Sequence, residues 1–206
     1  MRTPPRIGLA LFDFDGVLAH YRHEARLSVL AQAAGCTPAR VTAVLFESGL
    51  ERTYDSGRID TDTYLQRLGE GLGGPIDAAT WIGSRIAGSR ADPAVSALVA
   101  AVAERVPVGV LSNNGALMME AMRGIVPSLF PLLDGRVRCS GAIGVRKPER
   151  TIFEHALARF GAAARETLFL DDLFVNVQGA RAAGLHADTV VDARSMRTVL
   201  RRYGLA

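Results

Sequence analysis

Leu11-Phe12-Asp13-Phe14-Asp15-Gly16-Val17 closes a continuous apolar run that begins at Ile7. A short apolar run without polar alternation is typical of a strand that is buried on both faces of a sheet. Two aspartates, separated by one residue, follow directly at the carboxyl end of this run. The pattern predicts a central strand over residues 7–12 that presents an acidic pair where the strand ends.

Three further apolar runs end in polar residues in the same way. They cover residues 106–111, 167–170 and, more weakly, 187–191, and they are followed by Ser112, Asp171 and Asp192. Helical patterns over 92–105, 148–160 and 176–183 lie between them. Strands that alternate with helices predict an α/β fold with a doubly wound, parallel, Rossmann-like sheet.

In such a sheet, side chains at the carboxyl ends of the strands converge on one crevice, where ligands bind. The residues expected to meet there are Asp13, Asp15, Ser112, Asp171 and Asp172.

Residues 19–91 interrupt this alternation. They contain four amphipathic helical patterns, near 24–34, 38–48, 61–72 and 77–88, and no strand-like run is seen among them. A helical insertion just after the first strand predicts a small cap, or lid, over the crevice. We therefore expect a catalytic core from 1–18 and 92–206 and a cap from 19–91. The alternative is a second packing layer without a catalytic role.

The composition restricts the class of protein. The chain has 206 residues, 49% hydrophobic residues and a formal net charge of +3, as a folded globular protein would. Cys36 and Cys139 lie far apart without metal-ligand spacing, so we expect reduced thiols and a cytoplasmic protein. The arginines are scattered among acids, which argues against nucleic acid, and no apolar run predicts a membrane span. The positive charge balance would also suit a small phosphorylated metabolite as substrate, and a monomer or homodimer is expected.

Lys147 stands out because the other 23 basic residues of the chain are arginines. An ammonium is a compact point charge that can sit beside a single oxygen, whereas a guanidinium is a larger planar fork. The alternative is a chance surface lysine. The retention of one lysine, directly before Pro148, suggests a role that arginine cannot fill.

Four motifs together resemble the haloacid dehalogenase-like hydrolase superfamily. They are Asp13-Phe14-Asp15-Gly16-Val17, Ser112-Asn113, Lys147-Pro148, and Asp171-Asp172 with Asn176. The likeness covers essentially the whole chain, and four motifs in order are far more specific than a lone acidic pair. The insertion is similar to the small helical cap of one subgroup. The stretch from Arg146 to Gly184 looks most like sugar-phosphate phosphatases of the glucose-1-phosphate type.

The resemblance implies a Mg²⁺-dependent phosphatase that works through an aspartyl-phosphate. Asp13 is then the nucleophile, and Asp15 is the acid–base that protonates the leaving oxygen. The family pattern implies metal ligation by the Asp13 carboxylate, the Asp15 backbone carbonyl and Asp171, with Asp172 as an outer or alternative ligand.

Further residues follow from the same resemblance. Ser112, Asn113 and Lys147 would bind the phosphate, with Ser112 and Lys147 also stabilising charge during transfer. Asn176 would brace the metal loop, and Asn114 is interpreted as shaping the turn.

Other functions remain open at this point. A phosphomutase or phosphotransferase would use the same core and return the phosphoryl group to a second hydroxyl. A 2-haloacid dehalogenase would lack the second acid that Asp15 provides, and a non-catalytic phosphate-binding protein would need no nucleophile. The leaving group would meet cap residues, for which the candidates are His20, Arg22, His23, Arg52, Tyr54 and Arg58.

Overall fold

The computed structural model describes residues 5–206, and its centre is a sheet of five parallel strands in the order β5-β4-β1-β6-β7. Along the chain, the strands are β1 (Leu9–Phe12), β4 (Val108–Ser112), β5 (Val137–Cys139), β6 (Thr167–Asp171) and β7 (His186–Thr189). Strand β1 pairs with both β4 and β6, so the strand that carries the acidic pair lies in the middle of the sheet. The predicted α/β fold class is confirmed.

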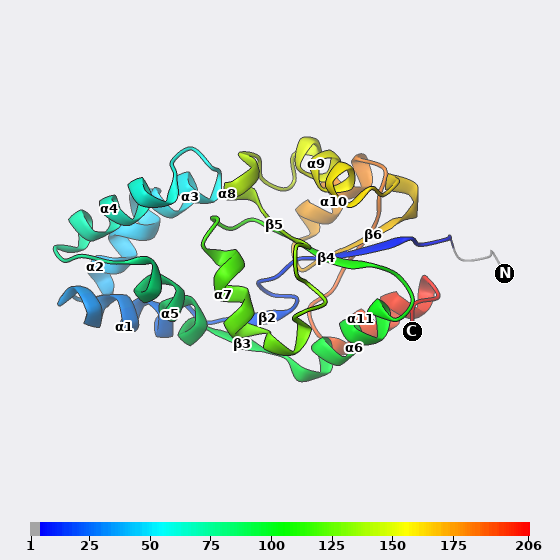
Figure 1. Ribbon diagram of the computed structural model, residues 1–206, viewed down its shortest axis with the longest axis horizontal. Coiled ribbons are helices and arrows are strands. Elements are labelled where there is room, and N and C mark those ends of the chain that lie inside the picture. Colours follow the sequence, from blue (N-terminus) through cyan, green and yellow to red (C-terminus); the bar gives the residue numbers. More distant parts are fainter. Residues whose placement is uncertain (1–4) are drawn as a thin grey trace.

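Helices cover both faces of the sheet, as Figure 1 shows. The helices of this part of the chain are α6 (Pro93–Ala103), α7 (Met118–Ile125), α8 (Ser140–Ile143), α9 (Arg150–Phe160), α10 (Phe174–Ala182) and α11 (Ala193–Arg202), with short 3-10 turns η2 (Pro127–Leu129) and η3 (Ala164–Glu166). Alternate residues of β1 face opposite layers: Leu9 and Leu11 pack with α9 and α10, and Ala10 and Phe12 pack with α6, α7 and α11. This two-sided burial explains the unbroken apolar run in the sequence.

The expected strands and helices are present with ends shifted by a few residues, but β5 was not predicted. It has only three residues, and a charged arginine, Arg138, lies between its two buried positions. A run of that length shows no periodicity that distinguishes a strand from a loop.

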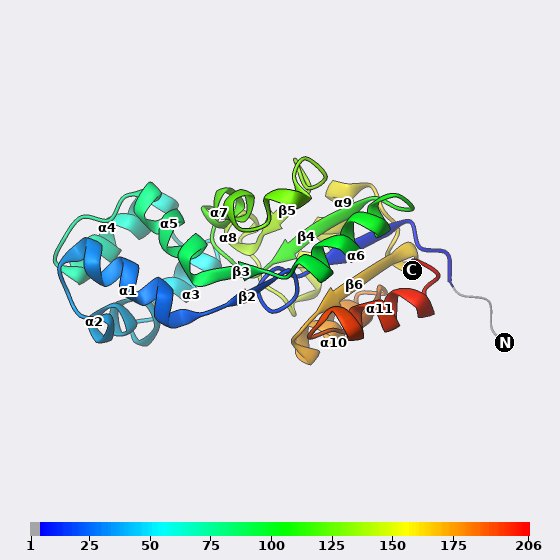
Figure 2. The same cartoon turned by 90° about the horizontal axis from the view of Figure 1, so that it is seen from below.

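The segment between β1 and α6 is helical. Its helices are α1 (His23–Ala34), α2 (Pro38–Thr42), the π-helical η1 (Ala43–Glu47), α3 (Leu50–Asp55), α4 (Thr61–Leu72) and α5 (Ala78–Gly88). Figures 1 and 2 place them at the end of the molecule opposite the C-terminus. We call residues 19–91 the helical segment.

Two details of the helical segment differ from the prediction. The helix expected over 38–48 is divided into α2 and η1, and α3 follows as an additional helix. The segment also begins with strand β2 (Ala19–Tyr21) and ends with β3 (Ser89–Ala91), although no strand was expected there. These strands pair antiparallel and bring the two connections to the core side by side. Strands β2 and β3 have three residues each, and they form because the two connections meet, so no hydrophobic pattern in the sequence predicts them.

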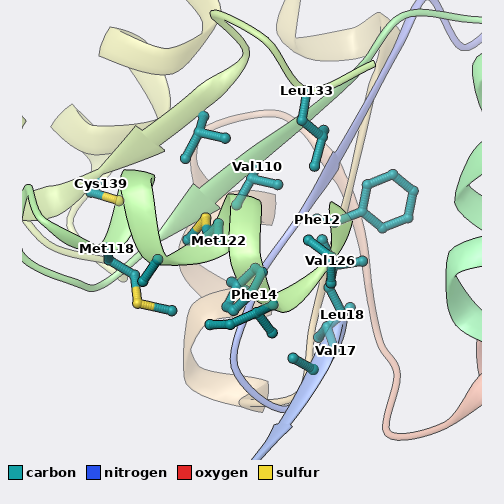
Figure 3. Close-up of a cluster of buried hydrophobic side chains, with 14 of the residues drawn as sticks. Phe12, Phe14, Val17, Leu18, Val110, Met118, Met122, Val126, Leu133 and Cys139 are labelled. Atoms are coloured by element: carbon teal, nitrogen blue, oxygen red, sulfur yellow. The ribbon is translucent and has the colours of Figure 1, made fainter. Parts of the chain in front are cut away.

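The residues on either side of the first aspartate are anchored in the core. Phe12 and Phe14 are fully buried, and Figure 3 shows them among side chains from β4, α7 and the end of β5. Burying a phenylalanine side chain stabilises the fold by about 1.5–3 kcal/mol. Because both neighbours are fixed in this way, the backbone position of Asp13 is fixed as well.

No single helix within residues 5–206 has the length and apolar character needed to cross a membrane. One bent pair, α1 with the helical run Pro38–Glu47, meets the length and composition criteria only when its two arms, which are bent by 106°, are taken together.

Candidate active site

Three neighbouring strands bring the predicted site residues together. Asp13 follows β1, Ser112 ends β4 and Asp171 ends β6, and these strands are adjacent in the sheet. The backbone N–H of Asp13 donates to the carbonyl of Leu170 at 2.8 Å, which continues the parallel pairing up to the acidic residue. The carboxyl edge of the sheet therefore collects residues that lie up to 158 positions apart in sequence, from Asp13 to Asp171.

Lys147 lies at the centre of this edge. Its Nζ is 2.8 Å from Asp13 Oδ1 and 2.7 Å from Asp171 Oδ2, and the side chain is completely buried. Burial alone would lower the pKa of Lys147, but the charges and hydrogen bonds of the two aspartates outweigh it and raise the pKa above its ordinary value. The one lysine of the chain is therefore a charged ammonium between two carboxylates, not a surface residue.

Asn113 holds Lys147 in place. Its Oδ1 accepts a hydrogen bond from the Lys147 backbone N–H at 2.8 Å, and its Nδ2 donates to the Lys147 carbonyl at 2.9 Å. The sequence analysis assigned Asn113 to phosphate binding. In the structure its side chain is engaged by the Lys147 backbone, so any contact of Asn113 with phosphate would use its backbone N–H.

Asp171 is fully engaged by protein groups. Its Oδ1 accepts from the backbone N–H of Leu173 at 2.8 Å, and Asn176 Nδ2 lies 3.0 Å from both carboxylate oxygens. Together with Lys147, these donors give each carboxylate oxygen of Asp171 two hydrogen-bond or ion-pair contacts, which leaves little room for a further ligand. Asn176 thus braces the loop after β6, as expected, by bonding to Asp171.

Asp172 has a different environment, because it is half-buried and faces Gly16. A Cβ added at Gly16 would lie 2.4 Å from Asp172 Oδ2, and Gly16 also adopts a positive φ of 83°. Only glycine therefore lets the loop after β1 approach this carboxylate so closely. Within residues 5–206, no lysine, arginine or amide side chain is bonded to Asp172, which leaves its oxygens free to bind a ligand.

Negative charge exceeds positive charge at this edge. Carboxylate oxygens of Asp13, Asp171 and Asp172 all lie within 4.8 Å of one another, and one ammonium is set against them. Burial and the Asp171 charge raise the pKa of Asp13 to about 7, despite the opposing effect of Lys147. Burial and Asp171 also raise the pKa of Asp172. Oxygen-only ligands with excess negative charge fit a hard divalent cation such as Mg²⁺.

Asp15 is held from the helical segment, by a residue that the sequence analysis did not select. Arg85 of α5 donates from one terminal nitrogen to both carboxylate oxygens of Asp15, at 2.7 and 2.9 Å. Arg85 is 3% exposed, and its guanidinium lies 4.3 Å from the centre of the Tyr21 ring. The sequence did offer one signal for Arg85: it lies four residues after Trp81, so a charged side chain falls on the apolar face of a predicted helix.

Asn114 joins two of the predicted catalytic residues. Its Nδ2 donates to Asp15 Oδ2 at 3.0 Å and to Ser112 Oγ at 2.8 Å. Asn114 therefore does more than shape the turn, because it sets the distance between the hydroxyl at the end of β4 and the second aspartate of the first motif.

The helical segment also contacts the loop that follows β4. Asp55 Oδ1 accepts from the Gly115 N–H at 2.8 Å, and the Tyr54 hydroxyl accepts from the Leu117 N–H at 3.0 Å. Of the candidate cap residues, Tyr54 thus meets the core. Arg52 and Arg58 line a pocket with Lys147.

The three remaining candidates on the helical segment, His20, Arg22 and His23, are exposed. Of these, His23 lies beside the residues that hold Asp15, because its ring packs 4.5 Å from that of Tyr21 and the charges of Arg85 and Asp15 both act on its pKa, which burial lowers.

Two phosphatases are among the curated proteins that are similar to this chain. A sesquiterpene phosphatase, astK, from Aspergillus oryzae is 27% identical over 185 residues, which cover 85% of this chain and 86% of that protein. The phosphatase MT3486 from Mycobacterium tuberculosis is 35% identical over 80 residues, or 39% of this chain and 36% of the relative.

Solved structures share the fold. A HAD-like hydrolase from Porphyromonas gingivalis superposes with a TM-score of 0.74 at 24% identity, covering 95% of this chain and 98% of the other. The HAD-family enzyme bt-2542 from Bacteroides thetaiotaomicron, in complex with magnesium and inorganic phosphate, gives a TM-score of 0.72 at 19% identity, covering 89% and 93%. At these identities the likeness establishes the architecture.

The family itself follows from the sequence match over most of the chain. The family model for haloacid dehalogenase-like hydrolases matches residues 7–184, which include every motif of the sheet edge described above. This chain belongs to the haloacid dehalogenase-like hydrolases.

Proposed function

We propose that this enzyme is a Mg²⁺-dependent phosphatase that hydrolyses a small phosphorylated metabolite, such as a sugar phosphate, through an aspartyl-phosphate on Asp13. The observation that carries the proposal is the buried contact of Lys147 with Asp13 and Asp171 beside the available carboxylate of Asp172. The two phosphatases among the relatives support the reaction class. The neighbour crystallised with magnesium and phosphate supports the cofactor.

The chemistry divides into two steps that use the same two aspartates. Asp13 attacks phosphorus, and Asp15 donates a proton to the leaving oxygen as the ester bond breaks. Asp15 then removes a proton from water, which attacks the phosphoryl group and regenerates Asp13. Acid–base assistance of this kind contributes about 10²–10⁴-fold to the rate. Lys147 and Ser112 hold the phosphoryl oxygens and stabilise their charge.

The contacts favour Asp172 over Asp171 as the ligand that completes the metal set. Asp171 already accepts from Lys147, Asn176 and a backbone N–H, whereas Asp172 is turned toward the Gly16 loop. We therefore assign Mg²⁺ to the carboxylates of Asp13 and Asp172 and the backbone carbonyl of Asp15. The ion supplies positive charge that offsets the repulsion between phosphate and carboxylates.

The helical segment acts in this proposal as the cap. Residues 19–91 join the core at the paired strands β2 and β3 and reach the site through Arg85, Tyr54 and Asp55. The core is then 1–18 and 92–206. A cap in this position would exclude bulk water from the reacting phosphate and would favour small substrates. The proposed reaction involves neither nucleic acid nor a membrane.

A phosphomutase is the second candidate, because the same core could return the phosphoryl group to another hydroxyl. A dehalogenase is disfavoured by Asp15, which a halide leaving group does not require. One experiment separates these reactions: phosphate release from p-nitrophenyl phosphate and a panel of sugar phosphates, with Mg²⁺ and with EDTA. We expect metal-dependent release. Isomerisation of a sugar phosphate without release would instead establish a mutase.

A further inference from the structure

A pocket of about 420 Å³ lies between α3 and the loop that joins α8 to α9. Arg52 and Arg58 line it from the helical segment, and Arg146 and Lys147 line it from the loop. Glu149 is the single acidic residue among the described residues that line it. The pocket is therefore strongly positive, in a molecule whose charges are otherwise mixed.

The three arginines of this pocket form no ion pair with the acidic side chains of residues 5–206. Among residues 5–206, ion pairs engage other arginines, such as Arg26 and Arg85, but none engages Arg52, Arg58 or Arg146. The Nε of Arg146 is also buried without a hydrogen-bond partner in the described part of the chain. A buried donor left unbonded costs free energy, so an anion that accepts from this atom would remove that cost.

The nearest candidate counter-charge is weak. The Asp55 carboxyl interacts with Arg146, but burial, reinforced by Glu51, raises the pKa of Asp55 to about 8. The raised pKa favours the neutral form of this carboxyl, which already accepts from the Gly115 N–H. The charge of Arg146 is thus left for another anion.

Backbone packing holds the two sides of the pocket together. Gly57 has a positive φ of 68°, and a Cβ there would lie 2.7 Å from the Gly141 carbonyl oxygen and 2.9 Å from Gly144 Cα. The turn between Arg52 and Arg58 therefore rests directly on the residues of α8 and its C-terminal glycine. This contact fixes the arginine-bearing turn opposite Arg146.

The pocket adjoins the reacting groups through Lys147, which forms part of its wall while its Nζ contacts Asp13 at 2.8 Å. We propose that the pocket binds a second anionic group of the substrate, a carboxylate or a second phosphate, carried by the leaving group. The inference rests on the proposed phosphatase function. Guanidinium groups match both anions in bidentate geometry, and clustered cations in a cleft concentrate anionic ligands.

The test compares matched substrates that differ in the second anion. One pair is 3-phosphoglycerate and glycerol 3-phosphate, and the other is glucose 1,6-bisphosphate and glucose 1-phosphate. With Mg²⁺, we expect kcat/KM to be higher for the first member of at least one pair. In the double variant Arg52→Gln, Arg58→Gln this preference should fall by about tenfold, mainly through KM. The responding pair identifies the anion as carboxylate or phosphate.

The matched control is Arg67→Gln, which removes an exposed arginine of α4 that lies outside this pocket. It should retain the preference of the parent enzyme. An equal preference in the parent and the double variant, or an equal loss in Arg67→Gln, would overturn the proposal.

A binding measurement separates failure of this inference from failure of the proposed function. Calorimetry of the same four compounds with the Asp13→Asn variant and Mg²⁺ measures affinity without turnover. Tighter binding of the compound with two anions, lost when Arg52 and Arg58 are also replaced, supports the pocket even if the parent enzyme releases no phosphate. Equal affinities within both pairs would refute the pocket while leaving the phosphatase assignment intact.

Discussion

Two groups of buried charges lie in this molecule, one at the sheet edge and one inside the helical segment. In the sheet-edge cluster, Lys147 contacts Asp13 and Asp171, with Asp172 alongside. The helical cluster pairs Arg26 with Glu51 at 2.7 Å, and both side chains are almost fully buried.

The two clusters differ in their charge balance. The helical cluster balances one cation against one anion: Tyr64 donates to Glu51, and Trp81 donates to the Tyr64 hydroxyl at 2.9 Å, although Arg26 Nε and Nη2 have no partner among the described residues. The sheet-edge cluster has three carboxylates against one ammonium. Burial of charge therefore does not by itself mark a reactive site. An excess of buried charge of one sign, which a bound ligand of opposite charge would neutralise, is a more specific sign of a reactive site.

The largest expected effect tests the sheet-edge cluster. Asp13→Asn should lower phosphate release by at least about 10⁴-fold, because an amide cannot serve as the nucleophile. The fold should be retained, since the substitution removes a carboxylate that Asp171 repels. Circular dichroism and steady-state assays check both points. Turnover comparable with that of the parent would assign the nucleophile elsewhere.

The helical cluster should respond in stability. Glu51→Gln leaves Arg26 buried without its counter-charge, and we expect a loss of about 3–5 kcal/mol in urea unfolding. Replacing both residues by apolar ones (Arg26→Met, Glu51→Leu) should recover most of it. Glu24→Gln, at an exposed position of α1, is the control and should change stability by less than about 0.5 kcal/mol.

The same pair predicts a pH dependence. Burial acts to raise the pKa of Glu51, but the charge and hydrogen bond of Arg26 outweigh it, so the folded-state pKa lies below the ordinary 4.5. The stability from this pair is therefore fully present above that value and is lost as the pH falls through the lowered folded-state pKa. The difference between parent and Glu51→Gln should narrow in acid. A difference that stays constant down to the acid transition would show that the pair contributes no charge-dependent stability.

Lys147→Arg sharpens the comparison, because it preserves charge and changes only shape. The Nζ lies between two carboxylates in a fully buried site and 5.2 Å from the Phe169 ring centre, which leaves no room for a guanidinium. We expect about a 10²-fold loss in kcat, the typical cost of losing one positioned donor. Full activity would mean that any cation suffices at this position.

The smallest effect concerns the two cysteines, one in each region. Burial raises the pKa of Cys139, at the end of β5, to about 12, whereas Cys36 in the helical segment is partly exposed. At pH 8 a thiol reagent such as Ellman's should label one thiol in the folded protein and two in denaturant. Loss of labelling in Cys36→Ser is the control, and two reactive thiols in the native protein would contradict the expectation.

The sequence alone predicted four of the five strands of the sheet, all except β5, and the residues at their carboxyl ends. Apolar runs that end in Asp13, Ser112 and Asp171 are local patterns, and the parallel topology follows from their alternation with helices. The position of Lys147 could also be inferred, because a single lysine among 23 arginines is visible without coordinates. These features depend on residues close in sequence or on composition.

The tertiary structure decided which groups meet those residues. Arg85 reaches Asp15 across 70 positions, and Asn113 bonds to the Lys147 backbone across 34. Such contacts depend on the packing of separate elements, which leaves no periodic signal in the chain. The distinction between Asp171 and Asp172 likewise depends on the donors that surround each carboxylate. Local sequence specifies secondary structure and its ends, and only the packed structure determines which polar groups are already satisfied and which remain free for a ligand.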